Sequence, residues 1–322
     1  MTDDAGVPEL RVRNAAAPLG RSVERPSATV VVLAYNSAEV IGGCLSALRE
    51  QDFDEPFETV VVWSGDTRIP ELVARACPRA TVVGQLDRLP TGAGRNLGIR
   101  STSGEIVVFL AADCRPAPDW LRRRAAAHRS GFRCVGGTVL LGEPAGAVAR
   151  ANHLLEYSEC MPGRPRQEFR GRSVNNLSFD RQIFAEYGMY EPGLACGEDT
   201  VFSARLAFRG EPMLFDPGIR ISHPGPRTLR EFAAHHVWHG AAYAKIIRDH
   251  GYGSDRYAVK VPRVAIFVRY PAMRLWGLAR RLLSSRRDLL GEALFFSPIL
   301  VLGVAACMVG IAREWWGEGS AT

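Results

Sequence analysis

Short runs of consecutive apolar residues alternate with polar turns through much of the chain. Residues 29–34 (TVVVLA), 58–63 (ETVVVW) and 106–110 (IVVFL) are three such runs. Strands that are buried on both faces of a sheet have sequences of this kind, and they belong to parallel sheets enclosed by helices. The stretch after the first run has its apolar residues on one helical face: Val40, Ile41, Cys44, Leu45 and Leu48. This order of strand and helix predicts an α/β fold, a mainly parallel mixed sheet with helices on both faces.

A carboxylate follows the run at residues 106–110. The chain continues through Ala111 and Ala112 to Asp113, with Pro116 three residues later. Ligands of open α/β sheets bind beyond the carboxyl ends of the strands. Asp113 is therefore a candidate for contact with a metal ion or a phosphate, although capping of a turn before Pro116 explains it equally well from this strand alone.

Other candidate groups lie near predicted element ends. Residues 91–98 (TGAGRNLG) resemble a dinucleotide fingerprint but lack its spacing, so they predict a helix N-terminus that either faces a phosphate or base together with Arg95 or simply begins a helix. Glu198 and Asp199 open another predicted helix, where carboxylates ordinarily serve the helix dipole. A last strand pair, at residues 212–216 and 218–222, is expected to end at His223.

Composition limits the class of protein. The chain has 322 residues, 47% of them hydrophobic, and a formal net charge of +6, with acidic residues spread among the basic ones. This favours one or two globular domains and phosphate ligands or an anionic membrane, with no nucleic-acid partner. Seven cysteines without a CxxC pair indicate reduced thiols of a cytosolic domain. The acidic N-terminus contains no secretory signal.

The last third of the chain contains a candidate membrane anchor. Residues 293–312 are twenty consecutive positions without a charge, about 30 Å as a helix, and Trp315 and Trp316 follow at an interfacial position. A buried helix of the main domain is the alternative. Arginines are denser before this segment than after it, which predicts a single-pass protein of the cell membrane with its main domain in the cytoplasm. Residues 264–283 favour an interfacial amphipathic helix.

Four segments in a fixed order resemble the family 2 glycosyltransferases with the GT-A fold, over residues 28–245. They are VVLAYN at residues 31–36, GRNLGIRSTSGEIVVFLAAD at 94–113, NNLSFDRQIFAEYGMYEPGLACGED at 175–199 and FDPGIRISH at 215–223. Each segment is weak alone, but together they raise the functional interpretation of Asp113, Asp199 and His223 above the structural one.

The resemblance implies inverting transfer of a sugar from a nucleoside-diphosphate sugar to a lipid-linked or cell-envelope acceptor hydroxyl. Asp199, of the Glu198–Asp199 pair, would be the catalytic base, and Asp113 and His223 would hold Mg²⁺ or Mn²⁺ against the diphosphate. The expected donor-binding residues are Ala34, Tyr35, Asn36, Asp66, Arg95, Ala112 and Asp113. Those expected on the acceptor side are His236 and Trp238.

Two departures from the family pattern leave alternatives open. Ala111 stands where the first aspartate of the D-x-D motif is usual, and the acidic turn after the second strand is Trp63-Ser64-Gly65-Asp66. Asp66 could take over the displaced role, or Trp63 could stack on the base. A catalytically impaired scaffold that binds a nucleotide sugar, and a transferase acting on polyprenyl phosphate, remain the competing functions.

The segment HHVWH places His235 and His239 one helical turn apart. A zinc site needs a third ligand and usually the glutamate of H-E-x-x-H, so metal binding is not expected from these residues. The expected organisation is a disordered arm (1–26), a GT-A domain (27–250), a basic amphipathic linker (251–288), a transmembrane helix (289–312) and a short tail (313–322).

Overall fold

The computed structural model describes residues 25–169, 176–250 and 265–317, so most of the expected arm, part of the expected linker and the end of the tail lie outside it. The strands are β1 (Ala28–Tyr35), β2 (Phe57–Ser64), β3 (Thr81–Gln85), β4 (Ile106–Ala111), β5 (Arg115–Pro116), β6 (Cys134–Leu141), β7 (Gln167–Phe169), β8 (Ser178–Asp180) and β9 (Met213–His223). The helices of the α/β domain are α1 (Ile41–Arg49), α2 (Ile69–Ala76), α3 (Thr91–Arg100), α4 (Trp120–Arg129), α5 (Ala147–Tyr157), α6 (Gln182–Tyr187), α7 (Glu198–Phe208) and α8 (Leu229–His250). After α8 the described chain contains α9 (Ile266–Ser285), a 3₁₀ turn (Arg287–Leu289), α10 (Leu290–Phe295) and α11 (Ser297–Trp316).

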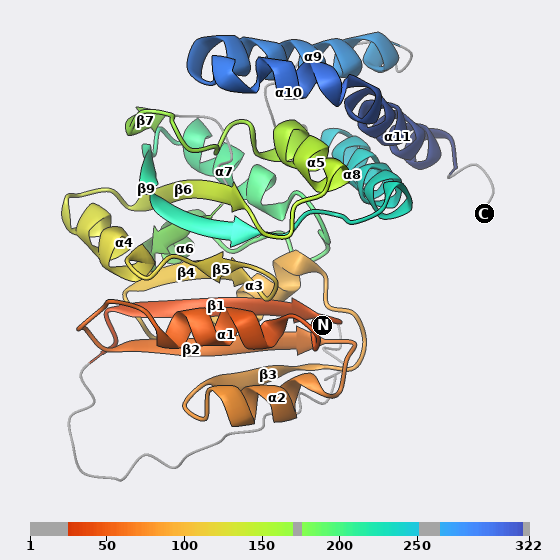
Figure 1. Ribbon diagram of the computed structural model, residues 1–322. Coiled ribbons are helices and arrows are strands. Elements are labelled where there is room, and N and C mark those ends of the chain that lie inside the picture. The colour runs from red at the N-terminus through yellow and green to blue at the C-terminus, as the bar shows by residue number, and fades with distance from the viewer. Residues whose placement is uncertain (1–24, 170–175, 251–264, 318–322) are drawn as a thin grey trace, which may run out of the picture.

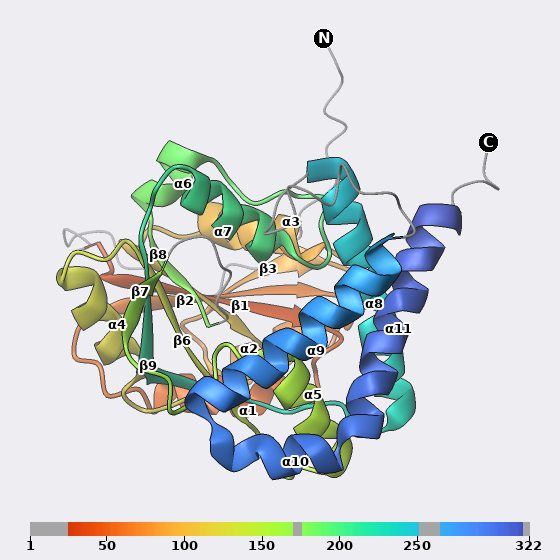
Figure 2. The ribbon, with the colours of Figure 1, turned by 90° about the horizontal axis from the view of Figure 1, so that it is seen from above.

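The strands form one mixed sheet in the order β3-β2-β1-β4-β8-β6-β9-β5, with β7 paired to β9. The pairs among β1, β2, β3 and β4 are parallel, whereas β8 runs antiparallel to both β4 and β6. Helices α1 and α2 lie on one face and α3, α6 and α7 on the other (Figures 1 and 2). The expected mixed α/β fold is confirmed.

The expected strand pair before His223 is instead one long strand, β9. It pairs in parallel with β6, and its register moves from Gly137 opposite Asp216 to Thr138 opposite Arg220. The intervening residues 217–219 bulge out of the ladder, which suits the Pro217–Gly218 dipeptide because proline cannot donate a ladder hydrogen bond. One continuous strand carries the chain directly to His223.

Close packing explains the glycine-rich segment at the start of α3. A Cβ on Gly98 would lie 2.3 Å from Cγ1 of Val31 in β1, and one on Gly92 would lie 2.0 Å from the carbonyl oxygen of Glu191. Helix α3 can approach the sheet and the loop before α7 only without those side chains. These glycines are therefore required for close packing of α3. This packing explains why the segment resembles a dinucleotide fingerprint.

Helices α9, α10 and α11 form an outer layer over α5 and α8, away from β1, β2 and β3 (Figures 1 and 2). Helix α11 follows α8 from Gly303, which faces the ring of Phe232, to Glu314, which pairs with Arg248 at 3.0 Å. Among the described residues, α11 is the one helix long and apolar enough to cross a membrane. One of its faces is covered by α8.

Candidate active site

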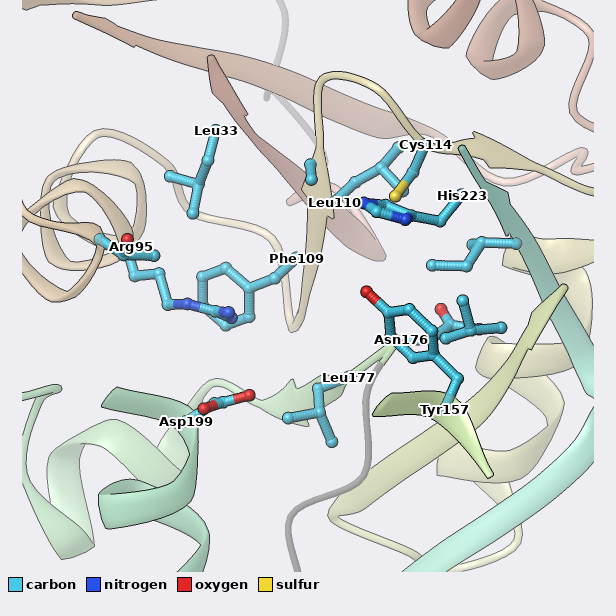
Figure 3. A pocket seen from close by; sticks show the side chains of 14 residues that line it. Leu33, Arg95, Phe109, Leu110, Cys114, Tyr157, Asn176, Leu177, Asp199 and His223 are labelled. Atoms are coloured by element: carbon cyan, nitrogen blue, oxygen red, sulfur yellow. The ribbon is translucent and has the colours of Figure 1, made fainter. Parts of the chain in front are cut away.

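A pocket of about 300 Å³ lies at the carboxyl ends of β1 and β4. Leu33 of β1 and residues 109–111 of β4 line it from the sheet, and α3, α5, α7 and β9 contribute Arg95, Tyr157, Asp199 and His223. In Figure 3, Arg95 and Asp199 lie on one side of the pocket, and Cys114 and His223 lie on the other. The ends of these strands are where a ligand is expected from the sequence, and the fold brings residues from distant segments to them.

Asp113 and His223 are in contact beside this pocket, with 3.4 Å between Oδ2 of Asp113 and Nε2 of His223. The short strand β5 explains the contact, because it pairs antiparallel with the end of β9 and so brings the turn before β5 against His223. Burial alone would raise the pKa of Asp113, but the hydrogen bond and charge of His223 outweigh it and lower that pKa. Burial would likewise lower the pKa of His223, and Asp113 raises it instead.

This pair fits a divalent cation as a partial ligand set. The possible ligand atoms of Asp113, Cys114 and His223 lie within 4.8 Å of one another. Burial raises the pKa of the Cys114 thiol, so the sulfur stays protonated and is a poor ligand for a hard cation. Nδ1 of His223 is buried and has no hydrogen-bond partner among the described residues. The polar contact of this ring is the one between Nε2 and the Asp113 carboxylate. Oxygen atoms of a diphosphate would complete such a site.

The two carboxylates at the start of α7 have different surroundings. Glu198 is 4% exposed and accepts a hydrogen bond from Nε of Arg95 at 2.8 Å. The Arg95 guanidinium lies 4.6 Å from the ring centre of Phe109 and 5.2 Å from that of Tyr190. Burial raises the pKa of Glu198, and Arg95 opposes that rise. Glu198 is therefore engaged with Arg95, whereas Asp199 lines the pocket.

The expected donor-binding turn follows β1. Asn36 has a φ of 47°, in the left-handed region that asparagine tolerates, so the chain turns sharply there. Ala34 and Ala112 are each 2% exposed and can offer a ligand little besides their main chains. Tyr35 is exposed, and the guanidinium of Arg88 lies 4.7 Å from its ring centre.

The turn after β2 settles one of the two alternatives for base recognition. The Trp63 side chain is 7% exposed and packs in the main core, so Trp63 cannot stack on a base. A Cβ on Gly84 of β3 would meet its ring, which shows how closely the indole is enclosed. Asp66 lies at the same sheet edge, with its carboxylate paired to Arg68 at 2.7 Å.

The two residues expected on the acceptor side point different ways. His236 is 1% exposed, with Nε2 3.1 Å from Oδ1 of Asn152 in α5, so it lies between helices and cannot contact an acceptor. The sequence predicted that this face of α8 is exposed, but α11 covers it. Helix α11 comes about seventy residues later in the chain, so the pattern within α8 does not reveal it. Trp238 is 37% exposed, and Arg88 lies 5.9 Å from its ring.

Sequence reasoning missed three residues near the site: Arg88, Tyr157 and Glu156. Tyr157 lines the pocket, and its ring centre lies 5.6 Å from that of His223. Arg88 lies beside both Tyr35 and Trp238. The amphipathic pattern of α5 gives no hint of Tyr157 or Glu156, since only the packing of α5 against β6 and α8 shows where these side chains point.

The model of the family described as "Glycosyl transferase family 2" matches residues 29–186. The chain is a family 2 glycosyltransferase. Glycosyltransferase AglE of Haloferax volcanii is 27% identical over 208 residues, which cover 62% of this chain and 67% of AglE. The putative glycosyltransferase EpsH of Bacillus subtilis is 32% identical over 102 residues, 30% of this chain and 29% of EpsH. The enzyme class expected from the four motifs is confirmed.

Two solved structures share the GT-A fold. The mannosyltransferase PcManGT from Pyrobaculum calidifontis, in complex with GDP-Man and Mn²⁺, is 21% identical with a TM-score of 0.60, over 92% of this chain and 89% of that one. S. aureus TarS 1–349 in complex with UDP-GlcNAc is 14% identical with a TM-score of 0.51, over 90% of this chain and 92% of that one. These likenesses show that the chain has the GT-A fold.

Proposed function

We propose that this glycosyltransferase moves one sugar, with inversion, from a nucleoside-diphosphate sugar to the hydroxyl group of a lipid-linked or cell-envelope acceptor. The observation that carries this proposal is the placement of Asp199 on the opposite side of the pocket from His223, with Asp113 against that histidine (Figure 3). Inverting displacement needs the acceptor on the face of the sugar opposite the leaving group. A base and a diphosphate-binding pair on opposite sides meet that need.

In this mechanism Asp199 accepts the proton of the acceptor hydroxyl, and Asp113 and His223 would hold Mg²⁺ or Mn²⁺. When bound, the cation would neutralise charge that develops on the leaving diphosphate. Arg95 and Glu198 keep the start of α7 in place, so that the Asp199 carboxylate faces the sugar. Tyr35, Asn36, Asp66 and the main chains of Ala34 and Ala112 are the proposed surroundings of the nucleotide. The complexes of PcManGT with GDP-Man and Mn²⁺ and of TarS with UDP-GlcNAc support a donor of this class.

The Asp199→Asn variant tests the assignment of the base. We expect it to bind GDP or UDP with Mn²⁺ as the wild type does, while release of nucleotide from GDP-Man or UDP-GlcNAc in the presence of membrane lipid extract falls about 10²–10⁴-fold. Glu71→Gln, on the exposed surface of α2, is the matched control. Turnover of Asp199→Asn within a few-fold of the wild type would refute the role of Asp199 as base.

The same assay separates the two competing functions. Ala111 removes one acidic group from the site, which favours a scaffold that binds a donor without turnover; nucleotide binding with no release by the wild type would establish it. A polyprenyl phosphate acceptor is already ionised at neutral pH and needs no base. Selective survival of transfer to polyprenyl phosphate in Asp199→Asn would identify that acceptor class.

We further propose that the protein attaches to the membrane through α9, α10 and α11. Their outward apolar residues are widely exposed: Val268 is 76%, Trp276 70%, Leu294 77% and Phe295 77%. A span through α11 would carry the charged and histidine residues of α8 to the depth of the hydrocarbon, because α8 lies along α11. The packing therefore favours insertion of this surface into one leaflet over the single crossing expected from the sequence.

A further inference from the structure

The fold supplies the third ligand that HHVWH lacks in the sequence. Glu156 is at the end of α5, and His235 and His239 lie one turn apart on α8, which runs beside α5 (Figures 1 and 2). Oε1 of Glu156 is 2.6 Å from Nε2 of His235 and 3.6 Å from Nε2 of His239. The three possible ligand atoms all lie within 4.8 Å of one another.

The spacing of these atoms suits a tetrahedral ion. Ligands at the usual zinc distances of about 2.0–2.1 Å are about 3.3 Å apart in a tetrahedron, and the two observed distances bracket that value. Two imidazole nitrogens and one carboxylate oxygen form a common zinc ligand set, in which water takes the fourth position. The histidine side chains are 35% and 37% exposed, so an ion can reach them from solvent.

A neighbouring group orients one of the histidines. Nδ1 of His239 lies 3.7 Å from Sγ of Cys196. With its proton on Nδ1, the ring donates to this sulfur and directs the lone pair of Nε2 toward Glu156. Metal-ligating histidines commonly have such a partner on the second nitrogen, which fixes the ring orientation and the tautomer.

The charges at the cluster favour a cation. The Glu156 side chain is only 11% exposed, and burying a carboxylate is costly unless a positive charge compensates it. The Arg274 side chain already interacts electrostatically with Glu156, and a divalent ion would add further compensating charge.

We propose that Glu156, His235 and His239 form a zinc site that fastens α5 to α8 at the edge of the active site. Tyr157, next to Glu156, lines the pocket, and Cys196 precedes Glu198 by two residues. The ion would thus stiffen the pocket wall and the segment leading to Asp199. His236 occupies the position of the glutamate base in H-E-x-x-H, so the role of the ion is to hold structure.

Calorimetric titration of Zn²⁺ into the full-length, chelator-treated protein without nucleotide tests this site. We expect one equivalent to bind to the wild type and none to Glu156→Gln or His239→Asn. Asp113→Asn and His223→Gln are the matched controls, and both should still bind one equivalent. Co²⁺ should give the strong visible absorption of a four-coordinate ion in the wild type and in these controls only.

Thermal unfolding separates loss of the ligand from loss of the fold. Zn²⁺ at about 100 times its Kd should raise the Tm of the wild type by roughly 5 °C and leave that of Glu156→Gln unchanged, while the zinc-free proteins unfold at similar temperatures. Absence of Zn²⁺ binding to the wild type would overturn the proposal. So would binding that survives in both cluster variants or is abolished by Asp113→Asn.

Discussion

Glu198 and Asp199 are adjacent, yet their environments assign them different tasks. Glu198 is enclosed with Arg95, so removing its charge would leave a buried guanidinium without its carboxylate. Breaking a buried ion pair from one side costs about 3–5 kcal/mol, whereas replacing both partners with apolar residues of similar volume is often neutral.

We therefore expect Glu198→Ala to lower the free energy of unfolding by about 3–5 kcal/mol, and Arg95→Met combined with Glu198→Leu to recover most of that loss. Urea-induced unfolding followed by circular dichroism measures both. Asp199→Asn is the control, with a change below about 1 kcal/mol. Equal stability of Glu198→Ala and the wild type would mean that the Arg95–Glu198 pair does not hold α7.

Asp113 and His223 provide few ligands of their own, because Ala111 replaces one acidic residue. Metal affinity should therefore be weak without nucleotide and should rise once a diphosphate adds oxygen ligands. Calorimetry with Mn²⁺, in the presence and absence of GDP or UDP, measures this difference, and His223→Gln should abolish it. The same Mn²⁺ affinity with and without nucleotide, or full turnover in EDTA, would contradict this ligand set.

His128 gives the stability a definite pH dependence. It is partly buried in α4, with Nε2 2.9 Å from Oγ of Ser178, and the loss of solvent around the ring lowers its pKa to about 3. Since the folded-state pKa lies below the unfolded value of about 6.5, the unfolded chain binds the proton first, and stability falls as the pH drops through this window. We expect His128→Gln to remove a few kcal/mol of this loss between pH 6.5 and pH 3, as measured by urea unfolding at several pH values. Parallel pH profiles of the variant and the wild type would contradict it.

Among the elements, the parallel strands β1, β2 and β4 could be predicted from the sequence. Several contacts between elements distant in the chain could not. Apolar runs fix β1, β2 and β4 because such strands are buried on both faces. Two-residue β5 has no sequence signal, yet its pairing with β9 joins Asp113 to His223. Glu156 meets His235 from a helix 79 positions earlier. The burial of Trp63 and His236 likewise depends on neighbours that periodicity does not reveal.

Helices α8 and α11 approach each other through glycines. A Cβ on Gly310 would lie 1.9 Å from the carbonyl oxygen of Val237, and one on Gly240 would lie 2.0 Å from that of Cys307. Because the obstacles are main-chain atoms, the helices would have to move apart.

We expect Gly310→Ala to lower the free energy of unfolding by about 1–3 kcal/mol despite the better helix propensity of alanine. Gly291→Ala, where a Cβ meets no atom within 4 Å, is the matched control and should be neutral or slightly stabilising. Thermal unfolding of the purified proteins compares the two. A stabilised Gly310→Ala variant would show that α8 and α11 are not packed as described.

At the scale of the whole molecule, the layer of α9, α10 and α11 is the proposed site of membrane attachment. Truncation after Ser285 would uncover apolar residues of α5 and α8, since Leu300 and Val304 of α11 pack in the same cluster as Leu155 and Phe232. Deletion therefore confuses loss of attachment with loss of folding, and surface substitutions are the better probe.

We expect Leu294→Ser combined with Phe295→Ser to release much of the protein from membranes without lowering its Tm, because both side chains are 77% exposed. Sedimentation with liposomes and extraction with alkaline carbonate measure this, and Leu86→Ser, an exposed residue beyond β3, is the control. Resistance of the wild type to carbonate would instead indicate a true crossing by α11.

The order of strands in the sheet also sets an order of folding. The four parallel strands β1 to β4 are complete at Ala111, and their contacts are local in the chain. The remaining pairs form later, because β4 pairs with β8 and β6 pairs with β9, and each partner strand follows some seventy or eighty residues later in the chain. Local contacts form before distant ones, and domains begin to fold during synthesis. On the ribosome, the half that carries the proposed donor-binding turn can thus assemble first. Asp199 and His223 join it last, so the growing chain acquires its chemistry only as the sheet closes.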